Sequence, residues 1–303
     1  MGARRRSAGA PAGGTALLAL GVGTAAFSRN PLGASVGVGR RVGVGGGVST
    51  QRVALVLEFD GTAFHGWQRQ ANAPSVQAAL ETALERLDGA PRRTKTCGRT
   101  DTGVHAEALL VHADVDAARW RRAPRAYVHG LNAHLPETLR VIGARAVDAE
   151  FDARLSCVGR AYRYRIWMRP TPPAIERWRH WWMPRPLDLD RMQEAASLWI
   201  GEHDFSAFRA AGCQAAHPRR TVHAVDIVPQ PWGVEVFVRA DAFLYRMVRF
   251  MVGALVEIGV GRKGVEWAEA LLDARARPPA APAHGLYFYD AFYAEFSARS
   301  LIW

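Results

Sequence analysis

Several residue types and patterns are scarce in this 303-residue sequence, and each shortage excludes a class of protein. Only Lys95 and Lys263 are lysines, so nearly all of the 39 basic residues are arginines. The three cysteines, at positions 97, 157 and 213, form no Cys-x-x-Cys pair, which excludes a zinc knuckle or ribbon. Sparse cysteines of this kind are typical of reduced thiols, so we expect a cytoplasmic protein. No apolar run reaches about 18 residues, so no membrane-spanning helix is expected.

Acidic residues are missing from the first 57 positions, which contain seven arginines. The formal net charge is +11, so only +4 (11 − 7) remains for residues 58–303. Arginine binds phosphate through two parallel hydrogen bonds, which makes a nucleic acid a reasonable partner. A solvated, arginine-rich surface explains the same composition equally well, so composition alone leaves both interpretations open.

Residues 1–50 form an extension rich in Gly, Ala, Ser and Arg. Its basic start and short apolar stretch resemble a signal peptide, and its lack of acids resembles a transit peptide. The Gly, Val and Arg stretch at residues 35–48 has no amphipathic period, which is typical of a flexible tail. We therefore expect the extension to be disordered or not made, and we leave it out of the fold.

The remaining sequence predicts an α/β fold of the α+β type, built from two similar halves at residues 51–155 and 156–296 and followed by a tail at 297–303. Alternating apolar positions and short apolar runs predict strands, at residues 52–59, 108–115, 160–167, 222–228, 234–238 and 286–293. Apolar residues at helical spacing predict helices, at residues 76–88, 189–200, 243–258 and 265–274.

The two predicted halves repeat the same order of a strand, a loop, a helix and further strands. The tetrapeptide Pro-Arg-Arg-Thr occurs at 91–94 and again at 218–221, each time at the entry to a predicted strand. Four residues can coincide by chance in an arginine-rich chain, but the coincidence agrees with the repeated order. We expect a mixed, mainly antiparallel sheet with flanking helices in each half, and an active-site cleft between the halves.

The stretch Cys97–Ala106 (CGRTDTGVHA) is the most informative part of the sequence. Two glycines allow a tight turn that holds Asp101 near Arg99 and His105. A neighbouring cation keeps a carboxylate ionised, so Asp101 is a candidate nucleophile or base. In the alternative interpretation, Asp101 accepts a hydrogen bond from its own backbone in an Asx turn.

Two aromatic stretches are further candidates for binding a nucleic acid. Phe64–Gln70 (FHGWQRQ) combines aromatic rings with two amides and an arginine, which suits base stacking and phosphate contact by residues such as Gln68. Tyr162 lies on a predicted strand, where its ring can stack on a base and its hydroxyl can relay a proton. The alternatives are a loop packed by Trp67 and a half-buried aromatic strand. Arg163 and Arg165 are expected on the opposite face of that strand.

Arg249 lies within the apolar helix predicted at 243–258. A guanidinium in such a place is costly unless it meets an anion, which indicates a buried carboxylate or a bound phosphate. Pairing with Glu257 or another acid is the alternative interpretation.

Taken together, these stretches resemble the tRNA pseudouridine synthase A family. The resemblance covers about residues 52–293 in the order of the family. Seven motifs carry it: Gly66–Gln70, Gly98–Ala106, Leu131–Pro136, Phe151–Ser156, Ala161–Ile166, His203–Arg209 and Met247–Gly253.

The resemblance implies isomerisation of uridine to pseudouridine at positions 38, 39 and 40 of the tRNA anticodon stem-loop. It implies that Asp101 is the catalytic aspartate, that Arg99 helps to extrude the target base and that Arg249 pairs with the aspartate. Tyr162 matches the tyrosine that stacks on the uracil and assists proton removal from C5. Gln68 and His105 are further expected substrate-binding residues.

The resemblance also implies a homodimer that uses no metal and no organic cofactor. One departure is Thr102, which stands where the family usually has Ala and whose hydroxyl could hydrogen-bond Asp101. Two other functions remain as alternatives. A non-catalytic RNA-binding protein would have no need of a carboxylate at position 101, and a metal-dependent nuclease would need clustered ligands that are not found around it.

Overall fold

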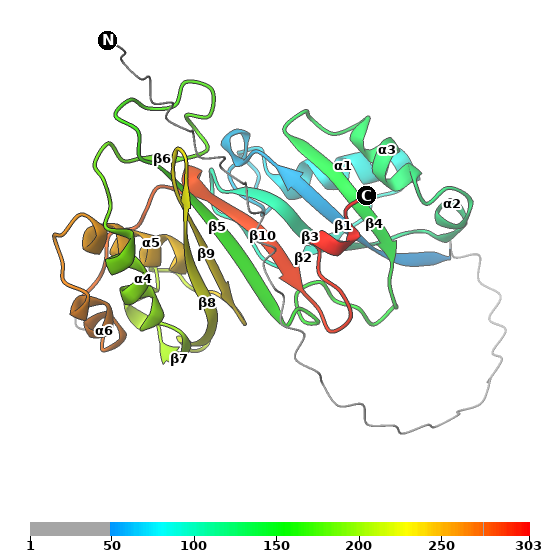
Figure 1. Cartoon of the computed structure of the whole chain (residues 1–303). Helices are drawn as coiled ribbons and strands as arrows, with labels where there is room; N and C mark the ends of the chain where they lie inside the picture. The colour runs from blue at the N-terminus through cyan, green and yellow to red at the C-terminus, as the bar shows by residue number, and fades with distance from the viewer. Residues whose placement is uncertain (1–48, 275) are drawn as a thin grey trace, which may run out of the picture. The chain divides into compact units, whose positions relative to one another are not determined.

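One mixed sheet of ten strands forms the centre of the protein, in a computed structural model that describes residues 49–274 and 276–303 (Figure 1). The expected disordered extension lies, up to residue 48, outside the described residues. Eight strands follow one another across the sheet: β4 (Leu139–Ala146), β1 (Thr50–Phe59), β3 (His105–Asp116), β10 (Leu286–Phe292), β5 (Gly159–Trp167), β9 (Gly233–Ala240), β8 (Arg219–Gln230) and β7 (Gly201–Asp204). Two short strands pair at the side of this path, β2 (Thr94–Thr96) with β3 and β6 (Trp181–Trp182) with β5.

Strand β10 joins the strands of the two predicted halves. It pairs with β3 in parallel at Tyr287 and Phe288 and with β5 in antiparallel fashion. Its residues are mostly buried, which is typical of a central strand. The predicted mixed α/β fold with mainly antiparallel pairing is therefore confirmed, and the strands of both halves belong to one sheet rather than to two.

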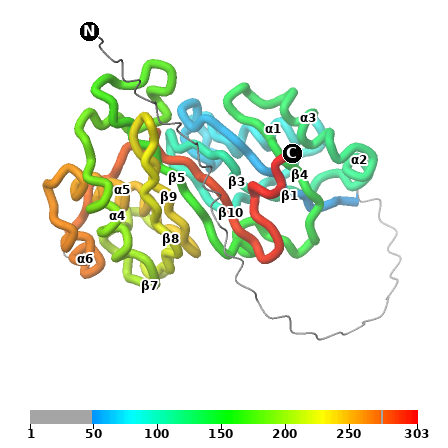
Figure 2. The backbone as a smooth tube through the Cα atoms, viewed as in Figure 1, coloured from blue at the N-terminus to red at the C-terminus, as the bar shows by residue number. Residues whose placement is uncertain are grey.

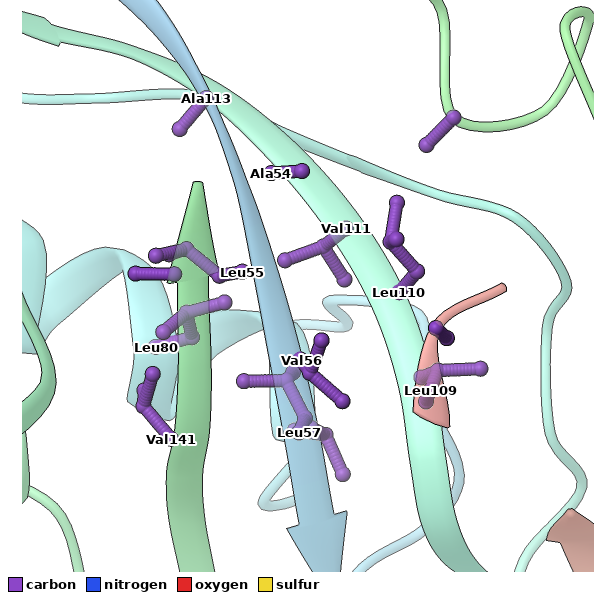
Figure 3. Close-up of a cluster of buried hydrophobic side chains, with 14 of the residues drawn as sticks. Ala54, Leu55, Val56, Leu57, Leu80, Leu109, Leu110, Val111, Ala113 and Val141 are labelled. Atoms are coloured by element: carbon purple, nitrogen blue, oxygen red, sulfur yellow. The ribbon is translucent and has the colours of Figure 1, made fainter. Parts of the chain in front are cut away.

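The helices flank the strands in two groups (Figure 1). The first group packs with β1, β3 and β4: α1 (Val76–Asp88), α2 (Ala117–Arg122) and α3 (Ala126–Asn132). The second group lies at the end of the sheet that contains β8: α4 (Leu189–Ser197), α5 (Met247–Gly259) and α6 (Glu266–Leu272). Each group covers its own hydrophobic core. Figure 3 shows Leu80 of α1 beside Leu55 and Val141 in the first core.

The ends of the helices follow from their sequences. The Ser75 hydroxyl accepts a hydrogen bond from the Ala78 N–H at 3.3 Å and begins α1, and Gly89, at φ 73°, ends it. Helix α5 begins at Met247 rather than at the predicted residue 243, because Arg246 adopts a left-handed conformation with φ 62°. This difference bears on the site described below.

The last residues of the chain, predicted as a tail, return to strand β4 (Figure 2). The Trp303 N–H donates to the Ile142 carbonyl at 3.1 Å. None of the helices in the described part of the chain has the length and apolar character that a membrane crossing requires.

Candidate active site

A cavity of about 1040 Å³ lies where the first predicted half meets the second. The turn between β2 and β3 lines one side, Tyr162 of β5 lines the wall, and the residues that lead into α5 line the other side. The charges of this lining are strongly unequal. Its acids are Asp101 and Asp152, whereas its basic residues are Lys95, Arg99, Arg154, Arg160, Arg220, Arg246 and Arg249. A cavity lined in this way attracts a polyanion.

The turn that carries Asp101 is held by backbone hydrogen bonds. The Trp67 N–H donates to the Thr100 carbonyl at 3.1 Å, and the Val104 N–H donates to the Asp101 carbonyl at 3.1 Å. Gly103 has φ +76°, which a residue with a side chain rarely adopts. Within the described residues, Arg249 is the hydrogen-bond donor to the Asp101 carboxylate, so the Asx-turn alternative is not adopted.

The loop of Phe64–Gln70 packs against this turn and is hydrogen-bonded to it. Trp67 is buried, as the packing alternative predicts, whereas Gln68 is exposed and lines the cavity. Gly66 has φ +85°, and a Cβ atom there would lie 2.6 Å from the Thr100 carbonyl oxygen. Only glycine therefore allows the two backbone segments to approach this closely.

Gly66→Ala is expected to displace the Asp101 turn. A clash of one methyl group with the backbone misplaces the reacting group, and a shift of about 1 Å costs about 10²-fold in activity. We expect this loss of kcat/KM together with a loss of stability of about 1–3 kcal/mol. Steady-state kinetics and urea unfolding measure the two effects.

Gly89→Ala is the matched control for this substitution. Gly89 has a similar φ of +73°, but a Cβ atom there meets nothing within 4 Å. It should cost about 1 kcal/mol of stability and leave activity unchanged. Equal activities of the two variants would contradict the close-approach argument.

Asp101 and Arg249 form the ion pair that the family resemblance predicts. The Arg249 Nη1 lies 3.3 Å from the Asp101 Oδ2, and its Nε donates to the Ala281 carbonyl at 2.8 Å. Glu257, the alternative partner, pairs with Arg262 at 2.7 Å instead. The guanidinium, held by the Ala281 carbonyl, thereby fixes the position of the Asp101 carboxylate.

Tyr162 is held by two aromatic neighbours in the cavity wall. Its ring centroid lies 4.9 Å from that of Phe243 and 5.1 Å from that of Phe288, both in edge-to-face arrangement. Desolvation raises the pKa of the Tyr162 hydroxyl, and the negative charge of Asp101 acts in the same direction. The hydroxyl therefore stays neutral near pH 7, and the fixed ring offers a stacking surface.

Arg99 lies on the exposed side of the turn and also lines the cavity. Its Nη1 reaches the Gln214 Oε1 at 3.5 Å, which connects the Asp101 turn to the loop before β8. Such a weakly held, exposed guanidinium is free to contact a large ligand.

The structure places His105 away from the cavity, although it is four residues from Asp101. Its side chain is buried, and its ring stacks on Tyr287 at 4.7 Å. The ring Nδ1 accepts from the Gly61 N–H at 3.0 Å, and Nε2 lies 3.1 Å from the carbonyl of Trp178. These contacts support the strands beneath the turn, so the expected substrate contact of His105 is not supported by its position.

Arg163 and Arg165 also lie outside the cavity. Arg163 pairs with Glu107 and Glu235, and Arg165 pairs with Glu235 at 3.2 Å and with Glu176 at 3.2 Å. They face away from Tyr162, as the strand alternation predicts. Their charges are satisfied by acids, so they do not contribute to the basic lining.

Four arginines that line the cavity, at positions 154, 160, 220 and 246, were not singled out as site residues from the sequence, and two of them contact Asp101 or its turn. Arg246 Nε lies 3.8 Å from the Asp101 Oδ2, and its spacing of three from Arg249 is the signal that could have indicated it. Arg160 donates from Nε and Nη2 to the Cys97 carbonyl at 3.2 and 3.1 Å and from Nη1 to the Asp241 carbonyl at 2.8 Å. Arg160 thereby ties the Asp101 turn to the segment that leads into α5. No pattern in the sequence indicated these carbonyl contacts.

Among residues 49–274 and 276–303, no three His, Cys, Asp or Glu side chains are grouped so that they could hold a metal ion. The two acids of the cavity lining already form ion pairs, Asp101 with Arg249 and Asp152 with Lys95 at 3.2 Å. The donor set of this cavity therefore suits an anion rather than a metal ion.

Comparison with known proteins finds close relatives. A family model described as tRNA pseudouridine synthase matches residues 195–294. The tRNA pseudouridine synthase A of Neisseria gonorrhoeae is 46% identical over 247 residues, which cover 80% of this chain and 92% of that protein. The protein of the same name from Shewanella woodyi is 44% identical over 247 residues, covering 80% of this chain and 94% of that protein. That from Hydrogenovibrio crunogenus is 44% identical over 246 residues, with 80% and 93% covered.

A solved structure also matches, from the crystal structure of a Cbf5-Nop10-Gar1 complex, over 67% of this chain and 54% of that chain. Its TM-score of 0.28 and identity of 12% are too low to add to the assignment. The relatives named above share more than two fifths of their residues with this chain along nearly their whole length. The chain therefore belongs to the tRNA pseudouridine synthase A family of isomerases.

Proposed function

We propose that the protein isomerises uridine to pseudouridine at positions 38, 39 and 40 of the tRNA anticodon stem-loop, with Asp101 as the nucleophile. The observation that carries this proposal is the Asp101 carboxylate, which faces a basic cavity and is held by the half-buried Arg249 at 3.3 Å. A protein that only binds RNA gains nothing from a negative charge at this point of a cationic cavity, so the carboxylate favours catalysis.

The reaction needs no external energy source and no cofactor. Asp101 attacks either C6 of the uracil or C1′ of the ribose, and the bond between N1 and C1′ breaks. The base rotates and rejoins C1′ through C5, the C5 proton is lost, and the aspartate is released. Arg249 orients the Asp101 carboxylate for the attack.

Tyr162 offers its ring to the face of the uracil during the rotation. Because desolvation raises the pKa of its hydroxyl, this group enters the reaction neutral and takes part in removal of the C5 proton by relay rather than as a phenolate. Arg99 and Gln68, which lie on exposed parts of the lining, are placed to hold the strand after the target base leaves the helix. Exposed arginines of the lining such as Arg154 bind the phosphate backbone, so that shape rather than base edges selects the stem.

Tritium release from tRNA with C5-labelled uridine tests the proposal. We expect release by the wild-type protein that is unchanged by EDTA, and sequencing of the product should place pseudouridine at positions 38, 39 and 40. Binding of tRNA without any release would favour the RNA-binding alternative, and release that EDTA stops would contradict a metal-free reaction.

The homodimer and the cytoplasmic location implied by the family resemblance belong to the same proposal. Light scattering of the purified protein at micromolar concentration is expected to give twice the mass of one chain. A mass that matches one chain, with full activity, would contradict the homodimer.

A further inference from the structure

The two arginines beside Asp101 are held very differently. Arg249 is 14% exposed and is fixed by its hydrogen bonds to the Ala281 carbonyl and to Asp101. Arg246 is 43% exposed, and its Nε is 3.8 Å from the Asp101 Oδ2, beyond hydrogen-bond distance. Its guanidinium donates no hydrogen bond to any residue that the structure describes. Arg246 is therefore a charged group whose donors are free and face the cavity.

The backbone of Arg246 indicates that this position serves more than the fold. Its φ of 62° and ψ of 12° are left-handed, a conformation that is unfavourable for a residue with a Cβ atom. Among the described residues, Ala274 is the other non-glycine residue with positive φ. Strained backbone of this kind gathers at functional sites, because a fold without such a need would place glycine there.

The left-handed turn brings Tyr245 and Arg246 to the cavity together. Both residues line it, and the Arg246 guanidinium lies 5.0 Å from the centre of the Tyr245 ring, which is 40% exposed. An arginine over an exposed tyrosine offers a cation and a flat ring side by side, which is a suitable surface for one nucleotide of an RNA strand.

We propose that Arg246 is a phosphate-binding residue, which leaves Asp101 when RNA enters the cavity and pairs with a phosphodiester next to the reacting nucleotide. This proposal rests on the proposed function. The carboxylate of Asp101 already has a hydrogen-bonded cation in Arg249, so it binds Arg246 only weakly. A phosphodiester has two free oxygens that match the fork of a guanidinium, and this pairing is stronger than a 3.8 Å contact.

The exchange also affects the reaction. Withdrawal of Arg246 removes one of the two cations that attract the Asp101 carboxylate, which makes the carboxylate a better nucleophile. The carboxylate is thus shielded in the free enzyme and exposed once the substrate strand is bound. Arg249 stays in place because its second anchor, the Ala281 carbonyl, does not depend on the substrate.

Arg246→Gly is the variant that tests this inference, because glycine accepts the left-handed backbone. We expect the KM for tRNA to rise about tenfold, whereas kcat should change much less. The plot of log binding constant against log salt concentration should lose about 0.7–0.9 of its slope, as for the loss of one phosphate contact. The melting temperature should stay the same or rise. Arg246→Lys keeps the charge and should keep the salt slope while it loses part of the affinity.

Ala274→Gly is the matched control. It relieves the same kind of backbone strain, with φ 54°, at an exposed position that does not line the cavity. It should raise the melting temperature without a change in KM or in the salt slope. Changes in KM for this control equal to those of Arg246→Gly would overturn the inference.

A structural role for Arg246 predicts a different pattern. Removal of a structural partner of Asp101 would lower the melting temperature and kcat together and leave the salt slope of binding unchanged, and this result would overturn the proposal. The salt dependence is measured by binding alone, so it tests the role of Arg246 even if the wild-type protein forms no pseudouridine. A wild-type protein that forms no pseudouridine would instead refute the proposed function.

Discussion

Asp101→Asn is expected to abolish tritium release from C5-labelled tRNA, with a loss of at least about 10³-fold in kcat. The amide has nearly the same shape as the carboxylate but cannot form the covalent bond that the reaction needs. Because Arg249 keeps its second hydrogen bond to the Ala281 carbonyl, the variant should remain folded and should still bind tRNA. Single-turnover release and a binding titration separate the two effects.

Asp152→Asn is the matched control for this loss of charge. Asp152 is the other acid of the cavity lining, and its carboxylate accepts hydrogen bonds from the backbone N–H groups of Arg154 and Leu155 at 2.9 and 3.1 Å. The oxygen of an amide can accept these bonds as well, so we expect activity within a few-fold of wild type. Full activity of Asp101→Asn, or an equal loss in both variants, would rule out Asp101 as the nucleophile.

The elements that periodicity predicts are found close to their expected limits. Alternation along residues 52–59 and 160–167 predicts the central strands β1 and β5, and the capping residue Ser75 predicts the start of α1. These features depend on neighbours in sequence. The insertion of β10 between β3 and β5 depends on pairing across more than 100 residues, and no local pattern indicates which strands a buried segment will join.

In the candidate site, too, local sequence patterns predict the conformation of a residue better than its distant partners. The glycines around Asp101 predict its turn, and the apolar surroundings of Arg249 predict that it meets an anion, but not whether the anion is Asp101 or Glu257. His105 was expected at the site because it is near Asp101 in sequence, yet it begins a strand and its ring packs on Tyr287. The direction of a side chain at the start of a strand depends on the sheet, which sequence distance does not describe.

Arg246 was missed for a related reason. The apolar run from residue 243 predicts a helix that contains it, and in a helix it would continue the face of its neighbours. The structure instead places a left-handed residue, Arg246, directly before the helix. Neither glycine nor asparagine, the residues that usually mark such a position, occurs there in the sequence. Positions where the chain departs from its local preference are thus the ones that sequence patterns describe least well.

Arg249→Met is the second substitution with a large expected effect. Methionine fills much of the same space but donates no hydrogen bond, so Asp101 loses its fixed cation and the Ala281 carbonyl loses its donor. Truncating one partner of a largely buried ion pair costs about 3–5 kcal/mol, which corresponds to about 10²–10⁴-fold in kcat/KM where the partner is the reacting group. The carbonyl left without a donor should cost about 1–3 kcal/mol of stability. Tritium-release kinetics and urea unfolding measure the two quantities separately.

Arg262→Met is the control that separates this role from loss of an arginine as such. Arg262 follows the end of α5 and pairs with Glu257 of that helix at 2.7 Å, but its side chain is 59% exposed. An exposed pair contributes about 0–1 kcal/mol, so this variant should keep its stability within that range and its activity unchanged. Arg249→Lys should fall between Arg249→Met and wild type, because lysine supplies the charge without the second fixed donor. Wild-type rates in Arg249→Met would show that Asp101 keeps its position without this arginine, and the neighbouring Arg246 would then have to hold it.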